Sequence, residues 1–442
     1  MPPGLSKSRL VILGAALTAV IIVLLLFAGV IPGFRVKEPN PANVTLTVWG
    51  TYDSIDVFHA IENEFAKIRS NVRLQYRELK PETYEMELIN ALAAGRGPDV
   101  FMFHNTWLPK HIDKIAGATE TQIPFATFRD LFPQAINQDF APNGTIFASP
   151  LYFDTLALFY NKDAFDKSGI ASPPRTWTEF EQATSRLKEV RSDTSEVIKA
   201  GAAIGGSEYS INRATDLLSL LFLQSGTEMV DKSFLGANFA RSQSGTRNTG
   251  EDALLFYTKF ANPSSPSYTW NDALHYSVDN FSEGGVGMIF NYSHQINILR
   301  AKNPFLNFGV AAVPQIASSE QPVAYANYWG LAVSNKTEKY AAAWDFVIQA
   351  TMYEPIALAY SKAGSHPPAL RSLIAANLNN PEYGVFAKQA LIARTWPQID
   401  NNEIEKIFSE MIIAVTSGRL SIGAALRKGE DEVSLLMRTR KK

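Results

Sequence analysis

The sequence predicts an α/β protein of two domains that follow a hydrophobic N-terminal segment. The chain has 442 residues, and one domain usually holds about 100–200. Strand and helix patterns alternate between residues 44 and 103, which is typical of a parallel sheet with right-handed crossovers. Residues 10–31 contain no charged side chain and are almost entirely Leu, Ile, Val, Ala and Gly.

Composition excludes several classes of function. Lys and Arg total 41 against 43 Asp and Glu, so the chain lacks the basic excess of a nucleic-acid-binding protein. It has no cysteine, which excludes disulfides, Cys-ligated zinc, iron–sulfur clusters, thiol nucleophiles and the lipidated cysteine of many bacterial surface proteins. The six histidines show no metal-ligand spacing. We therefore expect no metal, no cofactor and no nucleic-acid partner.

Residues 10–31 form the predicted transmembrane helix. At 1.5 Å per residue, these 22 residues cover roughly the 30 Å hydrocarbon core of a bilayer. Lys7 and Arg9 favour a cytoplasmic location for residues 1–9. The run is longer than the apolar part of most cleaved signals and ends in a poor cleavage site, so we expect an uncleaved anchor. A cleaved secretion signal and a buried hydrophobic helix stay open as well. Residues 32–43 read as a linker.

The next elements follow from hydrophobic periodicity. Residues 44–48 alternate apolar and polar side chains, which predicts a strand, and residues 55–68 carry apolar side chains three or four apart, which predicts a helix. The two patterns recur as a strand at 72–76 and a helix from Pro81 to about Gly95. Residues 100–103 are continuously apolar, as in a buried parallel strand.

The rest of the chain continues the mixture of helices and strands. Thr176 and Glu179 form a capping box that starts a helix extending to about residue 190. Further predicted strands are residues 146–148, 151–160, 286–291 and 308–313, and further predicted helices are 215–224, 251–261, 271–283, 338–351, 404–417 and 421–437.

Catalytic motifs are largely absent. The S-x-x-K match at residues 185–188 lacks its companion motifs K-T-G and S-D-N, and neither G-x-S-x-G nor H-E-x-x-H occurs. The glycines at residues 285–287 lack the third glycine of a dinucleotide site. A carboxylate pair for glycoside hydrolysis stays open, because its separation is set only in space. We expect that the protein is not an enzyme.

Aromatic and polar residues gather where predicted strands end. Ligands of open α/β sheets lie outside the carboxyl ends of the strands. A pyranose offers an apolar face to a Trp or Tyr ring, while its hydroxyls need amide, carboxylate or imidazole partners. For the tryptophans among them, burial in a core is equally open. The candidates for binding such a ligand are Trp49, Tyr52, Asp53, His104, Asn105, Trp107, Tyr209, Asn291, Ser293, Trp329 and Trp396.

Five motifs occur in an order that resembles one protein family. They are Gly-Pro-Asp-Val-Phe at residues 97–101, Tyr-Asn-Lys-Asp-Ala-Phe at 160–165, Pro-Arg-Thr-Trp-Thr-Glu-Phe at 174–180, Phe-Ser-Glu-Gly-Gly-Val-Gly-Met at 281–288, and residues 414–426. Over nearly all of residues 44–442 the chain is similar to the extracellular solute-binding proteins of bacterial ABC importers. Within them it resembles the group of maltose- and oligosaccharide-binding proteins.

The resemblance implies a periplasmic-binding-protein-like fold, in which two α/β lobes are joined by a hinge and separated by a cleft. It assigns residues 44–152 and 309–360 to lobe one, and residues 153–308 and 361–442 to lobe two. It also implies ligand contacts from Asp154 at the hinge, His104 and Asn105 in a lobe-one loop, and Asn291 in a lobe-two loop. Asn105 stands where maltose binders have an aspartate, and residues 293–294 replace a Pro-Trp pair, so the identity of the sugar stays open.

The implied function is that of a membrane-tethered, monomeric receptor outside the cytoplasm. It would close its lobes around a small-molecule ligand, an oligosaccharide, and deliver it to an ABC permease in the membrane. A receptor of this fold for iron, polyamine or phosphate would need clustered tyrosines or carboxylates, or a helix start that holds phosphate. An exported glycan-active hydrolase, and a tethered sugar sensor or adhesin that needs no permease, are also compatible with the sequence.

Overall fold

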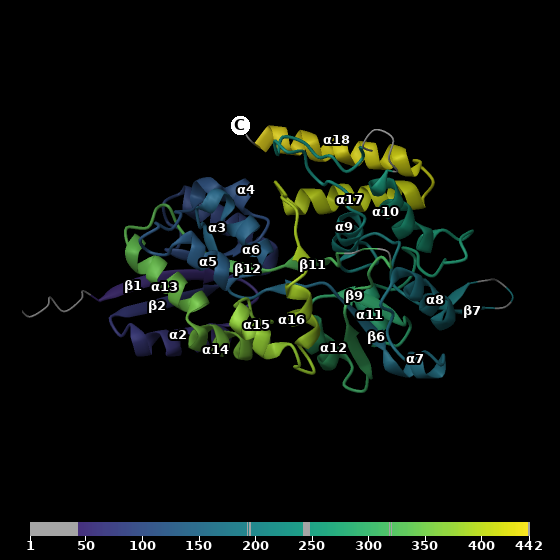
Figure 1. Ribbon diagram of the computed structural model, residues 1–442, viewed down its shortest axis with the longest axis horizontal. Coiled ribbons are helices and arrows are strands. Elements are labelled where there is room, and N and C mark those ends of the chain that lie inside the picture. The colour runs from purple at the N-terminus through teal and green to yellow at the C-terminus, as the bar shows by residue number, and fades with distance from the viewer. Residues whose placement is uncertain are drawn as a thin grey trace, which may run out of the picture.

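The computed structural model describes residues 43–191, 193, 196–241, 248–317, 319 and 321–440, which form two α/β lobes side by side (Figure 1). The predicted transmembrane helix at residues 10–31 lies outside the described residues, as do residues 1–9 and nearly all of the linker at 32–43. Within the described ranges, no helix is both long and apolar enough to cross a membrane.

The first lobe is built on a five-stranded sheet with the strand order β2-β1-β3-β12-β4. β1 pairs in parallel with β2 and β3, which confirms the predicted βαβαβ unit, whereas β12 pairs antiparallel with β3 and β4. The strands are β1 (Val44–Gly50), β2 (Val72–Glu78), β3 (Val100–His104), β4 (Ala148–Pro150) and β12 (Trp329–Val333).

Helices cover this sheet with their apolar faces. Ser54 caps the N-terminus of α2, which buries Phe58, Ile61 and Phe65, and the Phe65 ring lies 5.2 Å from Phe346 of α13. The helices of the first lobe are α2 (Ile55–Ile68), α3 (Pro81–Ala93), α4 (Leu108–His111), η1 (Ile112–Lys114), α5 (Phe125–Leu131), α6 (Gln134–Phe140), η2 (Pro142–Gly144), α13 (Tyr340–Met352) and α14 (Glu354–Gly364).

The second lobe contains two three-stranded sheets, β10-β6-β9 and β13-β11-β5, and the short pair β7-β8. Its strands are β5 (Asp154–Thr155), β6 (Ala157–Asn161), β7 (Glu189–Val190), β8 (Val197–Lys199), β9 (Met288–Asn291), β10 (Phe308–Ala311), β11 (Ala324–Asn327) and β13 (Ala393–Arg394). Its helices are α7 (Lys162–Lys167), α8 (Trp177–Leu187), α9 (Ala214–Gln224), α10 (Thr249–Thr258), η3 (Lys259–Ala261), α11 (Ser277–Ser282), α12 (Gln295–Lys302), α15 (Arg371–Asn377), α16 (Gly384–Ala390), α17 (Asn401–Thr416) and α18 (Ile422–Arg440).

Several local expectations in this lobe differ from the structure. The helix predicted to about residue 190 ends at Leu187, because residues 189–190 form β7, and the strand predicted over 151–160 is divided into β5 and β6. The hydroxyl of Thr176 accepts a hydrogen bond from the Glu179 backbone nitrogen (3.2 Å), so the predicted cap of α8 is present. The helix predicted over residues 271–283 is wrong in length, because only Ser277–Ser282 is helical. The Asp272 carboxylate accepts hydrogen bonds from the Ser207 amide and the Ser210 hydroxyl, and these tertiary contacts hold the preceding residues in turns.

The chain passes between the lobes three times: from β4 to β5, from β11 to β12, and from α14 to α15. β10 pairs antiparallel with β6, and β11 pairs with β5 and β13, so both belong to second-lobe sheets, although the family resemblance placed residues 309–360 in lobe one. α14 packs on α2, so this part of the first lobe extends to Gly364 rather than ending at residue 360.

Candidate ligand-binding site

A cavity of about 240 Å³ lies in the second lobe, at its boundary with the first. The charge of Arg213, in its lining, acts on both the Tyr52 hydroxyl and the His104 ring, so the cavity lies near these first-lobe groups. The cavity has room for about eight water molecules. It is lined by Glu208, Ile211, Asn212, Arg213, Thr215, Asp216, Tyr276 and Glu405.

Aromatic rings form the first-lobe wall of this cleft. The Trp329 ring centre lies 5.7 Å from Tyr52, 5.0 Å from His104 and 5.0 Å from Trp107. Tyr52 is 63% exposed, whereas Trp329 and Trp107 are buried. Tyr52 is therefore the ring that this wall offers to a ligand, and the buried rings behind it fix its position.

The loop after β1 is held in the shape that presents Tyr52. Tyr52 has a φ of 66°, in the left-handed region, which costs a tyrosine about 1 kcal/mol or more. Behind it, the Asp53 carboxylate accepts a hydrogen bond from the Tyr360 hydroxyl (2.7 Å) and contacts His366 Nε2 (2.9 Å). The Tyr76 hydroxyl donates to the Asp53 carbonyl (2.8 Å). Asp53 thus anchors the loop from inside the first lobe.

His104 is a neutral polar group in this wall. Its Nδ1 lies 2.8 Å from the Thr106 hydroxyl and its Nε2 lies 3.1 Å from Asn327 Oδ1. Burial lowers the pKa of His104 to about 4, and the Arg213 charge contributes in the same direction. The ring is therefore uncharged at neutral pH.

Arg213 is the cation of the second-lobe wall. Its φ of 66° is left-handed, and it immediately precedes α9. The guanidinium lies 5.4 Å from the centre of the Tyr292 ring, and Nη1 is 4.0 Å from Asp216 Oδ2, too far for a hydrogen bond. The Nε atom of Arg213 is buried and has no hydrogen-bond partner among the described residues. A ligand oxygen is the kind of acceptor that would satisfy it.

Three carboxylates surround this guanidinium. Glu208 accepts a hydrogen bond from the Thr215 hydroxyl (3.1 Å), Asp216 from Tyr292 (2.9 Å), and Glu405 from Asn401 (2.7 Å). Burial, followed by the charges of Asp216 and Glu208, raises the pKa of Glu405 to about 7. Because each carboxylate has lone pairs to spare, the cavity is rich in hydrogen-bond acceptors.

Three predicted ligand residues instead bond to other parts of the protein. Asp154 accepts hydrogen bonds from the Ser293 amide (2.9 Å) and hydroxyl (2.6 Å), and burial raises its pKa to about 6. Asn105 donates to the Asp139 carboxylate (3.2 Å) and accepts from the Tyr328 amide (3.3 Å). The Asp154–Ser293 bonds therefore lie within the second lobe, whereas Asn105 joins the end of β3 to the crossing from β11 to β12.

The remaining predicted residues are scattered. Asn291 donates to Asn212 (3.0 Å) and so supports the cavity lining, and Tyr209 is 77% exposed next to Glu208. Trp49 is half-buried, with the Arg77 guanidinium 4.6 Å from its ring. Trp396 lies in the second-lobe core, where it stacks on Phe408 at 5.9 Å and is 3% exposed.

Sequence reasoning missed the charged residues of the cavity. Glu208, Arg213 and Asp216 lie between β8 and the first turn of α9, and Glu405 lies on α17. The signal that could have found them was the concentration of charge at the start of α9, a helix that is otherwise almost wholly buried.

The arrangement suits a polyhydroxylated ligand. A hydroxyl group can accept from Arg213 and donate to a carboxylate, and an apolar sugar face can lie on Tyr52. In the part of the chain that the structure describes, no group of three or more His, Asp or Glu side chains could hold a metal ion.

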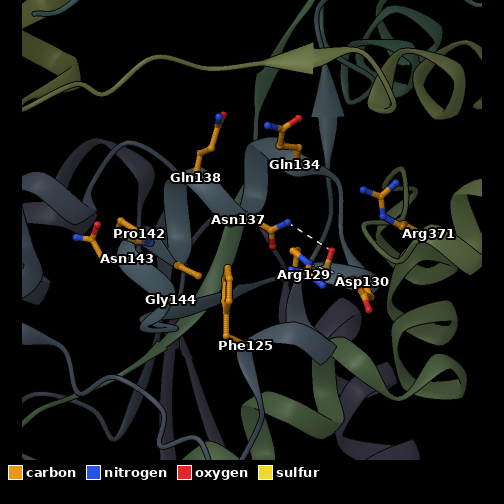
Figure 2. A pocket seen from close by; sticks show the side chains of 11 residues that line it. Phe125, Arg129, Asp130, Gln134, Asn137, Gln138, Pro142, Asn143, Gly144 and Arg371 are labelled. Atoms are coloured by element: carbon orange, nitrogen blue, oxygen red, sulfur yellow. Dashed lines mark hydrogen bonds and ion pairs between the residues drawn. The ribbon is translucent and has the colours of Figure 1, made fainter. Parts of the chain in front are cut away.

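A second hollow, of about 930 Å³, lies on the first lobe between α5, α6 and the start of α15 (Figure 2). Gln134, Gln138 and Arg371 are arranged around it, and Asn137 donates to the Arg129 carbonyl (3.4 Å). None of the predicted ligand residues lines it.

Comparison with known proteins identifies the family and the fold. Residues 56–355 match the family model of the bacterial extracellular solute-binding proteins. A binding protein of Brucella abortus is 23% identical over 269 residues, covering 58% of this chain and 59% of that protein. The maltotriose-binding protein of Pyrococcus abyssi is 24% identical over 326 residues, covering 70% of this chain and 63% of that protein. The chain thus spans about three fifths of the length of these curated relatives.

Solved structures share the fold. The sugar-binding protein MalE of Xanthomonas citri has a TM-score of 0.75 at 18% identity, covering 90% of this chain and 98% of that one. The cyclic α-maltosyl-1,6-maltose binding protein of Arthrobacter globiformis has a TM-score of 0.74 at 20% identity, covering 90% and 100%. Since the family model matches well over half of the chain and both lobes have this fold, the protein belongs to the bacterial extracellular solute-binding proteins.

Proposed function

We propose that this chain is a monomeric receptor outside the cytoplasm that binds an oligosaccharide and passes it to an ABC import permease. The observation that carries this proposal is the acceptor-rich cavity around Arg213, which lies opposite the exposed Tyr52 ring. The names of the Pyrococcus relative and of the structurally similar proteins, which refer to sugars, support the same ligand class.

Closure of the lobes explains how such a receptor would capture its ligand. A ligand that contacts Arg213 and Tyr52 at once binds the closed form more tightly than the open form, and so shifts the population toward closure. The permease would then recognise the closed arrangement. Asn105, which bonds to Tyr328 at the crossing from β11 to β12, would move little while the walls on either side approach.

Membrane attachment is the second part of the proposal. Residues 10–31 would act as an uncleaved anchor with residues 1–9 in the cytoplasm, in place of a lipidated cysteine, which the chain lacks. Membrane fractionation of the full-length chain checks this: the protein should resist extraction at high pH. Removal of residues 1–31 should abolish membrane attachment. Recovery of the intact chain in the soluble fraction would refute the anchor.

Ligand binding is tested by thermal unfolding and calorimetry of the detergent-purified full-length chain with a panel of neutral oligosaccharides. A true ligand at one hundred times its Kd should stabilise the folded state by about 2.7 kcal/mol. A panel of maltose-, mannose- and glucosamine-type oligomers that gives neither heat nor a shift in Tm would contradict the sugar assignment. Turnover of a chromogenic glycoside would instead indicate the hydrolase.

A further inference from the structure

Three charged side chains and one histidine lie together where the two lobes meet. Lys110 Nζ, at α4 of the first lobe, lies 2.6 Å from Glu85 Oε1 on α3 and 2.9 Å from Asp400 Oδ2, the N-cap of α17 in the second lobe. His111 Nε2 lies 2.8 Å from the same Glu85 oxygen. Figure 1 shows the N-terminal end of α17 directed toward α4. We call Glu85, Lys110, His111 and Asp400 the rim cluster.

The rim cluster is poorly hydrated in this arrangement. The Asp400 side chain is 3% exposed and the Lys110 side chain 15% exposed. Burial alone would raise the pKa of Glu85, but hydrogen bonds from His111 and Lys110 outweigh it and lower the pKa to about 2. Separation of the lobes would break the Lys110–Asp400 pair, and removal of either partner would leave the other charge buried and unpaired in this arrangement.

The rim cluster is connected to the cleft on both sides. In the first lobe, His111 packs edge-on against Trp107 at 5.8 Å, and Trp107 packs against Trp329, which touches Tyr52. In the second lobe, Asp400 caps the helix that carries Glu405. The elements that present ligand-facing groups therefore also carry the interlobe ion pair.

We propose that the Lys110–Asp400 pair is a latch that sets the balance between open and closed lobes, and thereby tunes ligand affinity without contact to the ligand. The conformational part of this inference stands on the ion pair itself. Only the change in affinity rests on the proposed function. Lys110 and Asp400 are accordingly positioning residues.

The test measures the distance between the lobes in the full-length, ligand-free chain. Because the chain has no cysteine, Met86→Cys on α3 and Lys428→Cys on α18 provide two exposed labelling sites, one on each lobe. The side chain of Met86 does not face that of its neighbour Glu85, since consecutive helical residues point in different directions. Pulsed electron paramagnetic resonance then reports the distance distribution in this labelled background and in variants built on it.

The variants are Lys110→Met and Asp400→Asn. Asparagine caps a helix about as well as aspartate, so Asp400→Asn removes the charge and keeps α17 capped. The matched control is Lys406→Met, which breaks the exposed pair with Glu403 on the same helix. We expect both latch variants to shift the distance distribution to longer distances, whereas the control should match the parent. The variant that combines Lys110→Met with Asp400→Asn should add little to the shift of either single change.

Ligand affinity separates this inference from the proposed function. If an oligosaccharide binds, both latch variants should weaken it by about tenfold, because a smaller fraction of the protein is in the closing-competent form. Longer distances without any sugar binding would support the latch and contradict the sugar assignment. Unchanged distances in both latch variants, or an equal change in Lys406→Met, would overturn the latch.

Discussion

Replacing Glu405 by glutamine should stabilise the protein at alkaline pH and leave its stability nearly unchanged at pH 5. Glu405 has a folded pKa of about 7, raised by burial and by Asp216 and Glu208, against 4.5 in the unfolded chain. Between these values the folded state holds a proton that the unfolded state has lost, so stability falls as the pH rises through this window. Above pH 7, the charged carboxylate of Glu405 lowers the free energy of unfolding by about 3 kcal/mol.

Glutamine removes this charge while its amide oxygen can still accept the hydrogen bond from Asn401. Urea unfolding at pH 5 and pH 8.5 should therefore show a gain of about 2–3 kcal/mol at pH 8.5 and less than about 0.5 kcal/mol at pH 5. Glu410→Gln, which removes an exposed carboxylate on the same helix, is the control and should change little at either pH. An equal gain at both pH values, or a loss at pH 8.5, would refute the electrostatic account.

Three further predictions follow from particular contacts. Arg213→Met should weaken ligand binding at least about tenfold, because the ligand loses a charged hydrogen-bond donor. The affinity of Arg213→Lys should lie between those of Arg213→Met and the parent. Unchanged affinity in calorimetry would contradict the role of this guanidinium. His104 has a pKa of about 4 in the folded state and 6.5 in the unfolded state, so its contribution to stability is lost as the pH falls from 6.5 to 4. In the His104→Asn variant, the free energy of unfolding should depend less on pH over this range. Gly330→Ala should destabilise by about 2–3 kcal/mol in urea unfolding, since a Cβ there would lie 2.4 Å from the Ser149 carbonyl oxygen between β12 and β4.

Elements that bury one face were predictable from the sequence. β1, α2, β2, α3 and β3 lie within two residues of the predicted ranges. The first four alternate between core and solvent, and β3 was predicted from its unbroken apolar run, which is buried throughout. β12 is also buried throughout but was not predicted, since Gly330 interrupts the apolar run of Trp329–Val333. Its pairing with β3 depends on a partner far away in the chain, which local patterns do not encode.

The site was predictable only where it follows strand ends. Tyr52 and His104 were found because they lie just after or at the end of β1 and β3. Arg213 and Glu405 come together from α9 and α17, which are adjacent only in the folded lobe. Trp396 could not be distinguished from a cleft tryptophan, because the Phe408 ring that buries it is supplied by α17.

The place of β12 in the first sheet has a consequence for biogenesis. His104 of β3 pairs with Trp329 of β12, so the sheet stays unfinished until the chain has been synthesised beyond the whole of β5 to β11. The second lobe is completed later still, because it includes α17 and α18. Contacts so distant in sequence form slowly, and loop closure must precede them. Neither lobe can therefore complete its native fold until nearly the whole chain has been synthesised.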